Sequence, residues 1–153
     1  MPGVSETTIE YNTDVSRAII SLIMSGAAER TPRVRYVMSH GGGTIIGLAG
    51  RFLGQQASAE NLAKTPEPNS RLHHLRRFYY DTAASTNPVI IEALKRMVGP
   101  SQILFGTDFP FVSSSTIAAG LRNTGLTPQE MAALERGNAE GIYAYLRSAA
   151  RAG

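Results

Sequence analysis

The sequence contains no cysteine, and this absence removes three chemistries at once. A chain of 153 residues without cysteine has no disulfide framework, no thiolate metal ligand and no cysteine nucleophile. The sequence also has little excess of positive charge, because fifteen basic and twelve acidic residues give a net charge of only +3. The basic residues form no stripe with interleaved aromatic residues, so we expect no nucleic-acid partner.

Long hydrophobic runs are missing as well. No apolar stretch of the sequence approaches the ~20 residues that cross a bilayer. Residues 1–6 have neither the basic nor the apolar region of a signal peptide. We therefore expect no membrane partner and a cytoplasmic location. The hydrophobic content of 42% is typical of one globular domain with a real core, here spanning residues 1–153.

One strongly patterned stretch, residues 34–44, organises the rest of the chain. It begins with β-branched and aromatic residues, as a strand does, and continues into His40 and three glycines. His40 is therefore expected at the carboxyl end of a strand, the edge at which parallel α/β folds bind ligands. The alternative is that His40 only caps the strand through a hydrogen bond. The glycines lack the spacing of a nucleotide-binding loop, so they are a weak signal for phosphate.

The remaining pattern alternates helices with strands. Further strands are predicted at residues 78–83 and 102–108, and residues 1–12 and 58–72 are expected to be loops. Apolar spacing and capping residues predict helices over residues 14–25, 44–56, 88–98, 116–121 and 138–147, with a capping box at residues 127–130. This order indicates parallel strands joined by right-handed crossovers.

Two side chains carry most of the expected chemistry. His40 and Asp108 both fall at carboxyl ends of strands, which lie on the same side of a parallel sheet, so they can converge on one pocket. An imidazole and a carboxylate suit a divalent metal, or a base and its partner. The alternative for Asp108 is a carboxylate that caps the following turn. For Asp81, near the end of the second strand, hydrogen bonding to a neighbouring loop is the favoured interpretation.

Three other polar residues attract attention for their positions. Arg51, eleven residues after His40, would ordinarily be a solvent-facing helix arginine. His73 and His74 are adjacent, so on a strand they would point to opposite faces. We expect both histidines on the surface or in a loop.

Three ordered motifs together resemble the amidohydrolase-related (amidohydrolase 2) family. They are the His40 glycine turn with Arg51, residues 78–83, and residues 103–111. The similarity points to the branch of aminocarboxymuconate-semialdehyde decarboxylase and its aromatic-acid relatives. It implies an α/β fold in which the chain is the carboxyl-terminal portion of a metal-dependent (β/α)8 TIM barrel, with three parallel strands and flanking helices.

The resemblance also implies roles for individual residues. Asp108 would bind the divalent metal, usually zinc, and take part in catalysis beside His40, the acid/base group. Arg51 would bind a substrate carboxylate, in some members within a neighbouring subunit, so a homo-oligomer is an expected assembly. The implied function is a decarboxylase (carbon–carbon lyase) or hydrolase acting on a small aromatic or unsaturated carboxylic acid.

The family's other metal ligands have no counterpart in this sequence. They are a His-x-His pair on the first barrel strand and a histidine on the fifth, and His73 and His74 match neither. We therefore expect poor metal affinity. The alternative function is a truncated, non-catalytic α/β remnant that self-associates or pairs with a full-length relative.

Three strands alone leave two open sheet edges. We expect residues 34–40 and 102–108 to form these edges, and the isolated chain to be oligomeric, aggregated or marginally stable. The apolar residues expected to lose cover there are Val34, Tyr36, Val37, Met38, Ile103, Leu104 and Phe105.

Overall fold

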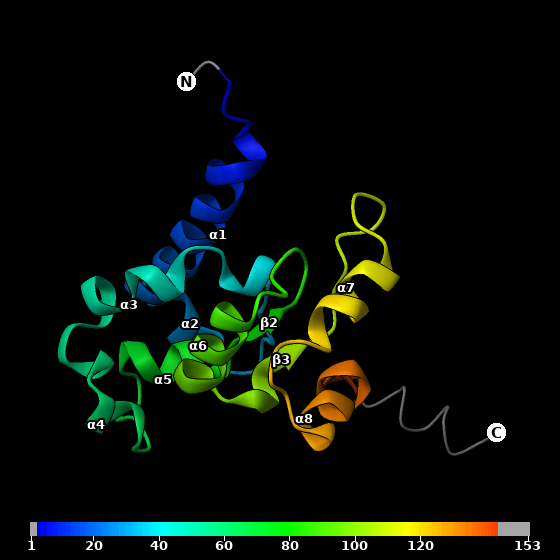
Figure 1. Cartoon of the computed structure of the whole chain (residues 1–153). Coiled ribbons are helices and arrows are strands. Elements are labelled where there is room, and N and C mark those ends of the chain that lie inside the picture. The colour runs from blue at the N-terminus through cyan, green and yellow to red at the C-terminus, as the bar shows by residue number, and fades with distance from the viewer. Residues whose placement is uncertain (1–2, 144–153) are drawn as a thin grey trace.

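A small parallel sheet lies in the middle of a shell of helices (Figure 1). The computed structural model describes residues 3–143, and within them the sheet has three strands in the order β1-β2-β3. The strands are β1 (Val37–Met38), β2 (Tyr79–Asp81) and β3 (Ile103–Leu104). Both strand pairs are parallel, as the alternating sequence pattern predicted.

Helices supply most of the remaining structure. Between β1 and β2 the chain forms a 3-10 turn, a longer helix and two short ones before α5. The elements are α1 (Glu6–Met24), α2 (Ala27–Arg30), η1 (His40–Gly42), α3 (Ile45–Leu53), η2 (Gly54–Ala57), α4 (Ala59–Leu62), α5 (Arg71–Arg77), α6 (Pro88–Val98), η3 (Pro100–Gln102), α7 (Ser114–Leu121), α8 (Pro128–Ala132), the π-helical η4 (Ala133–Gly137) and α9 (Asn138–Ile142). In the part of the chain that the structure describes, no helix is long and apolar enough to cross a membrane.

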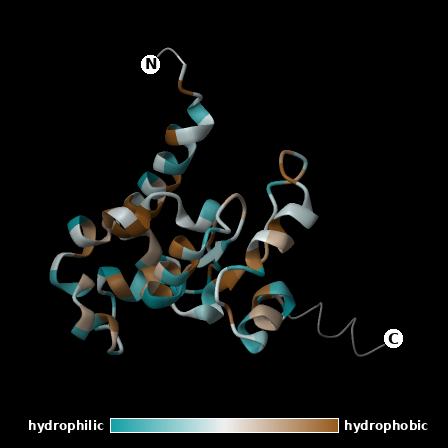
Figure 2. Cartoon of the chain, in the orientation of Figure 1, coloured by the Kyte–Doolittle hydropathy of each residue, from teal (hydrophilic) through white to brown (hydrophobic). Residues whose placement is uncertain are grey.

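One face of the sheet is fully covered. Met38 aligns with Tyr80, and Tyr80 with Ile103; all three side chains are at most 7% exposed. They join a core that also contains Ile45, Leu75, Ile91, Leu94 and Leu121. The opposite face is more open, since Val37 is 42% exposed. The short loop after β3 is hydrophobic and stands away from the body (Figure 2).

The helix predictions were right in the middle of the chain and wrong near its start. Asn87 caps α6 with Pro88 in its first turn, and Thr127 and Glu130 form the predicted capping box. In contrast, α1 begins at Glu6 with Ser5 as its N-cap, so residues 6–12 are helical. Residues 59–62, predicted as loop, form α4 because Ser58 caps them. The predicted extension of the last helix to residue 147 lies outside the described residues.

The two sheet edges are not equally open. At the β1 edge, Val34 and Val37 are exposed, as predicted, but the prediction was wrong for Met38, which is buried in the core. On β3 the prediction was wrong, because Ile103 and Leu104 are buried. The Phe105 N–H donates to the Leu134 carbonyl in η4 (3.0 Å), and the Asn138 amide donates to the Ile103 carbonyl (2.8 Å). The C-terminal helices therefore cover the β3 edge.

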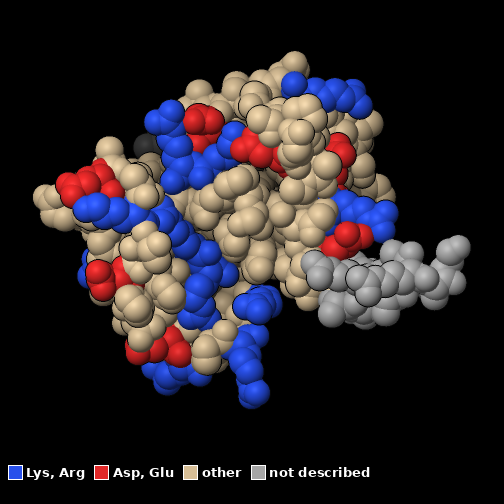
Figure 3. All heavy atoms as spheres, turned by 90° about the horizontal axis from the view of Figure 1, so that it is seen from below, with Lys and Arg blue, Asp and Glu red and all other residues tan. Residues whose placement is uncertain are grey.

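Lys and Arg side chains gather in a band on the underside of the molecule (Figure 3). Two arginines of α5 have a clear structural task. Arg76 donates to the carbonyls of Leu62, Lys64 and Met97, and Arg77 donates to those of Ala28, Thr31 and Pro32. The Arg76–Arg77 cluster thus ties α5 to neighbouring segments.

Candidate functional site

The turn after β1 has an uncommon backbone. Four successive residues, from His40 to Gly43, have positive φ values of 54°, 62°, 82° and 66°. A Cβ at Gly43 would lie 2.0 Å from the main-chain oxygen of Asn12, and one at Gly42 would lie 2.9 Å from the Tyr80 ring. The glycines are therefore required by the backbone and by the close approach of α1.

Ser16 fastens α1 to this turn. Its buried hydroxyl contacts the Gly42 carbonyl (3.2 Å) and the Thr44 hydroxyl (2.9 Å), and it accepts the Thr44 N–H (2.8 Å). This places the amino-terminal half of α1 beside the residues that follow β1.

His40 is held by its main chain and its ring. Its N–H donates to Asp81 Oδ1 (2.9 Å), and its Nδ1 lies 3.1 Å from the Ala83 carbonyl oxygen. A carbonyl oxygen only accepts, so Nδ1 carries a proton and Nε2 is the nitrogen left for chemistry. His40 can therefore make a capping hydrogen bond through Nδ1 and still offer Nε2 for chemistry, so its two predicted interpretations are compatible.

Asp81 makes the hydrogen bonds to a neighbouring loop that were predicted for it. Its Oδ1 accepts the N–H of His40 and the N–H of Ala83 (3.1 Å). Burial raises the pKa of the Asp81 carboxyl; the two N–H groups and His40 oppose that shift, and the Asp108 charge adds to it.

Asp108 stands in a turn with φ of 64°. The turn is closed by its main-chain oxygen, which accepts the Phe111 N–H (2.9 Å), and by the Thr107 hydroxyl, which accepts the Phe109 N–H (3.1 Å). Within residues 3–143 no hydrogen bond engages the Asp108 carboxylate. Its turn-capping alternative is therefore not what the structure shows, and the carboxylate is available to a ligand.

His40 and Asp108 line one cavity of about 470 Å³, which confirms that the two strand ends converge. Sequence reasoning missed the other lining residues, because it placed the start of α1 too late and treated the segment after β3 as a connection. They are Thr7, Tyr11, Asn12, Ala84 and Phe111. Ser5, a good N-cap residue, is the signal that could have found the lining residues on α1.

Arg51 does not reach this cavity within the chain. It is exposed on α3 and lines a separate hollow of about 220 Å³ with Ile20, Leu48 and Phe52. The two remaining histidines lie on α5, where the prediction of surface or loop positions was wrong for His74. His74 is only 3% exposed, because it falls on the inner side of the helix beside Leu75.

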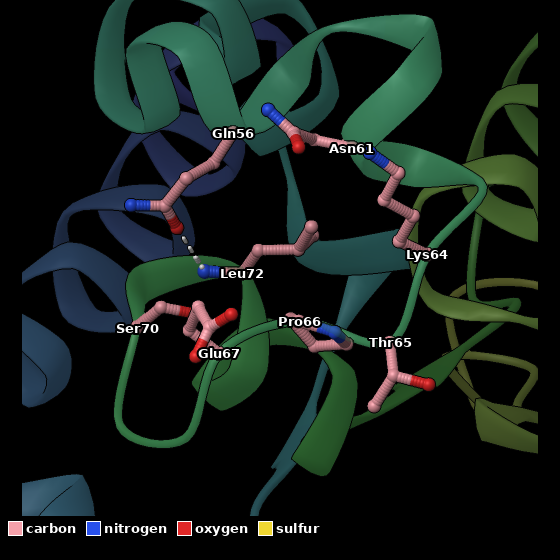
Figure 4. Close-up of a pocket in the computed structure, with 8 residues that line it drawn as sticks. All are labelled: Gln56, Asn61, Lys64, Thr65, Pro66, Glu67, Ser70 and Leu72. Atoms are coloured by element: carbon pink, nitrogen blue, oxygen red, sulfur yellow. Dashed lines mark hydrogen bonds between the residues drawn. The ribbon is translucent and has the colours of Figure 1, made fainter.

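A third hollow of about 380 Å³ lies between α4 and the start of α5 (Figure 4). Several of its polar groups are already engaged: Gln56 accepts the Leu72 N–H (2.9 Å), and Lys64 pairs with Glu60. It lacks an imidazole beside a carboxylate, so it is not the candidate catalytic site. Its lining residues are Gln56, Asn61, Lys64, Thr65, Pro66, Glu67, Ser70 and Leu72.

The residues around His40 do not complete a metal site. Among the described residues, no group of three or more histidine, aspartate, glutamate or cysteine side chains is placed to hold a metal ion. Protein metal sites ordinarily use three or four such ligands. His40 and Asp108 would thus be two ligands at most.

Comparison with known proteins explains this geometry. The family model described as Amidohydrolase matches residues 11–144. The chain belongs to the amidohydrolase family. Its relatives include the decarboxylase macB of Penicillium terrestre, 35% identical over 119 residues, which cover 76% of this chain and 35% of macB. The 6-methylsalicylic acid decarboxylase acuB of Aspergillus aculeatus is 32% identical over 142 residues, covering 88% of this chain and 41% of acuB.

The predicted branch is represented too. A 2-amino-3-carboxymuconate-6-semialdehyde decarboxylase of Dictyostelium discoideum is 26% identical over 94 residues, which cover 61% of this amidohydrolase chain and 26% of that enzyme. The dihydroxybenzoic acid decarboxylase of Polaromonas sp. JS666, solved with manganese and 2-nitroresorcinol, superposes with a TM-score of 0.75 at 20% identity. That match covers 89% of this chain and 41% of the solved one, so the fold is confirmed as part of a (β/α)8 barrel.

Proposed function

We propose that this chain provides part of the active site of a metal-dependent decarboxylase acting on a small aromatic or unsaturated carboxylic acid. The observation that carries the proposal is the shared cavity of His40 and Asp108. Support comes from relatives that are decarboxylases of 6-methylsalicylic and dihydroxybenzoic acids. A hydrolase is the alternative reaction for the same pair of side chains, and the cytoplasm is the compartment we propose.

His40 supplies the proton in this mechanism. With Nδ1 bonded to Ala83, a protonated ring presents its second proton on Nε2. Transfer of that proton to the substrate ring carbon that bears the carboxylate makes this carbon tetrahedral. The bond between this carbon and the carboxylate then breaks, and CO2 leaves. The electron pair of the broken bond returns to the substrate ring and makes it aromatic again. The neutral His40 afterwards recovers a proton from solvent.

Asp108 and Arg51 have binding roles in the proposal. Asp108 offers a free carboxylate to a divalent cation, zinc by family resemblance or manganese as in the Polaromonas structure. Such a cation would supply charge stabilisation, but the described residues do not complete its site, so its other ligands must come from elsewhere. Arg51 lies outside the cavity, which suits binding of a substrate carboxylate in a neighbouring subunit of a homo-oligomer.

A non-catalytic role is the second candidate. It is favoured by the missing cluster of three ligands among the described residues and by the extent of the chain, which spans 35% of macB and 41% of acuB. In this case the protein acts through association with itself or with a full-length relative.

A graft separates the two candidates. Residues 11–144 would replace the matching segment of acuB, and release of CO2 from 6-methylsalicylate would be measured. We expect activity within about a hundredfold of the parent, since several residues around the substrate change. A folded graft without activity, beside an active parent, would favour the non-catalytic role.

A further inference from the structure

We propose that Asp81 is the positioning residue of His40, and that it fixes the tautomer in which Nδ1 carries the proton and Nε2 is free. This inference rests on the proposed role of His40, but its first test does not require activity. It assigns a task to a half-buried carboxylate that does not line the cavity.

The contacts form a closed ring. One oxygen of Asp81, Oδ1, accepts both the His40 N–H (2.9 Å) and the Ala83 N–H (3.1 Å). The Ala83 carbonyl in turn accepts from His40 Nδ1 (3.1 Å). Asp81 therefore fixes both ends of the histidine, its main chain directly and its ring through Ala83.

His40 needs such a restraint. Its φ of 54° lies in the left-handed region, which is unfavourable for a residue with a Cβ. The glycines that follow it cannot hold it there, because they tolerate many conformations. A carboxylate that accepts two N–H groups is a strong and directional anchor, since charge-assisted hydrogen bonds exceed neutral ones.

Gly106, two residues after the end of β3, leaves room for the Asp81 carboxyl group. A Cβ at Gly106 would lie 2.7 Å from the Asp81 Cβ and 2.9 Å from its Cγ. Any larger residue would push the Asp81 side chain away from His40. The missing side chain at Gly106 therefore leaves a space that fits the Asp81 carboxyl group. A chance contact at the end of a strand would not require such a space.

The tautomer can be read directly by NMR of the whole chain with 13C- and 15N-labelled histidine. Three histidines give a simple spectrum, and H73Q and H74Q assign two of the signals, so that the third belongs to His40. We expect wild-type His40 to show the Nδ1–H tautomer, from its ring 13Cδ2 and 15N shifts. D81A should shift these signals toward the Nε2–H form, whereas D81N, whose amide oxygen can accept the same two N–H groups, should restore them.

A second variant protects the test against misfolding of D81A. G106A keeps every hydrogen-bonding group but displaces Asp81, so it should shift the His40 signals as D81A does. G47A is the matched control, because no atom lies within 4 Å of a Cβ at Gly47. In the acuB graft, D81A should lower kcat about 10–100-fold while KM changes less than about threefold.

A purely structural role for Asp81 predicts another pattern. D81A and G106A would then lower the melting temperature but leave the His40 tautomer of the folded fraction unchanged, and that result would overturn the proposal. An inactive graft with the expected tautomer shifts would instead contradict the decarboxylase assignment alone.

Discussion

Ser16 is a buried hydroxyl at the point where α1 meets the glycine turn. S16A removes the partner of the Gly42 carbonyl and one partner of the Thr44 N–H. Leaving buried polar groups unsatisfied should lower the free energy of unfolding by about 1–3 kcal/mol. Urea denaturation measures this change. S21A, on the exposed side of the same helix, should change the free energy by less than about 0.5 kcal/mol.

His74 gives the chain a pH-dependent stability. Burial first, then the charges of Arg77 and His73, hold the pKa of His74 below its ordinary value of 6.5, and Glu29 opposes them. Its Nδ1 accepts from the Arg77 guanidinium (3.3 Å), which also requires a neutral ring. Below pH 6.5 the unfolded chain gains a proton that the folded chain refuses, so stability should fall as the pH drops toward the lowered pKa.

Denaturation midpoints between pH 5 and 8 test this dependence. H74Q keeps an acceptor for Arg77 and should flatten the decline below pH 6.5, whereas H73Q should retain it. A decline that is equally steep in H74Q would show that another group causes it.

The positions of some functional residues could be predicted from the sequence, and those of others could not. His40 and Asp108 were found because a position at a strand's end follows from local pattern. Tyr11 was missed since the start of α1 depends on a single capping residue, Ser5. The burial of His74 was missed because the sequence pattern predicted no helix at α5, and only the packing of α5 on the core decides which side faces inward.

Asn138 protects the outer edge of β3. Its amide donates to the carbonyls of Ile103 (2.8 Å) and Pro100 (2.9 Å), groups that no neighbouring strand satisfies within residues 3–143. N138A should cost about 1–3 kcal/mol and increase self-association, because the edge loses its cover. Urea denaturation and sedimentation velocity measure the two effects. N123A, an exposed asparagine, is the control, and equal behaviour of the two variants would contradict this role.

The strands illustrate what local pattern leaves open. Their parallel pairing followed from alternation with helices and their order from the family resemblance, but β1 and β3 pair over only two residues each. Apolar residues such as Val34 suit a strand, yet pairing requires a neighbour, and β1 has one only on the β2 side. Cover of the β3 edge came from η4 and α9, a long-range contact that propensity does not encode.

The whole molecule exposes apolar groups that a stable monomer would bury. Val37 lies on the open face of β1, Phe109 in the turn after Asp108 and Phe111 at the cavity, and they are 42%, 78% and 85% exposed. Each forgoes roughly 1.5–3 kcal/mol of burial, against a typical net stability of about 5–15 kcal/mol. We expect the isolated chain to associate, with a melting temperature that rises with protein concentration. Sedimentation and thermal unfolding at several concentrations measure this. A compact monomer with a concentration-independent transition above about 60 °C would contradict it.

The central claim is that His40 transfers the proton and Asp108 binds the divalent cation. It is tested most directly by measuring bound manganese or zinc together with CO2 release in the acuB graft. We predict that D108N loses metal and activity together, whereas H40N keeps the metal and loses about 10²–10⁴-fold in kcat. An H40N graft that releases CO2 at the unsubstituted rate, or a D108N graft that retains full metal and activity, would contradict the assignment.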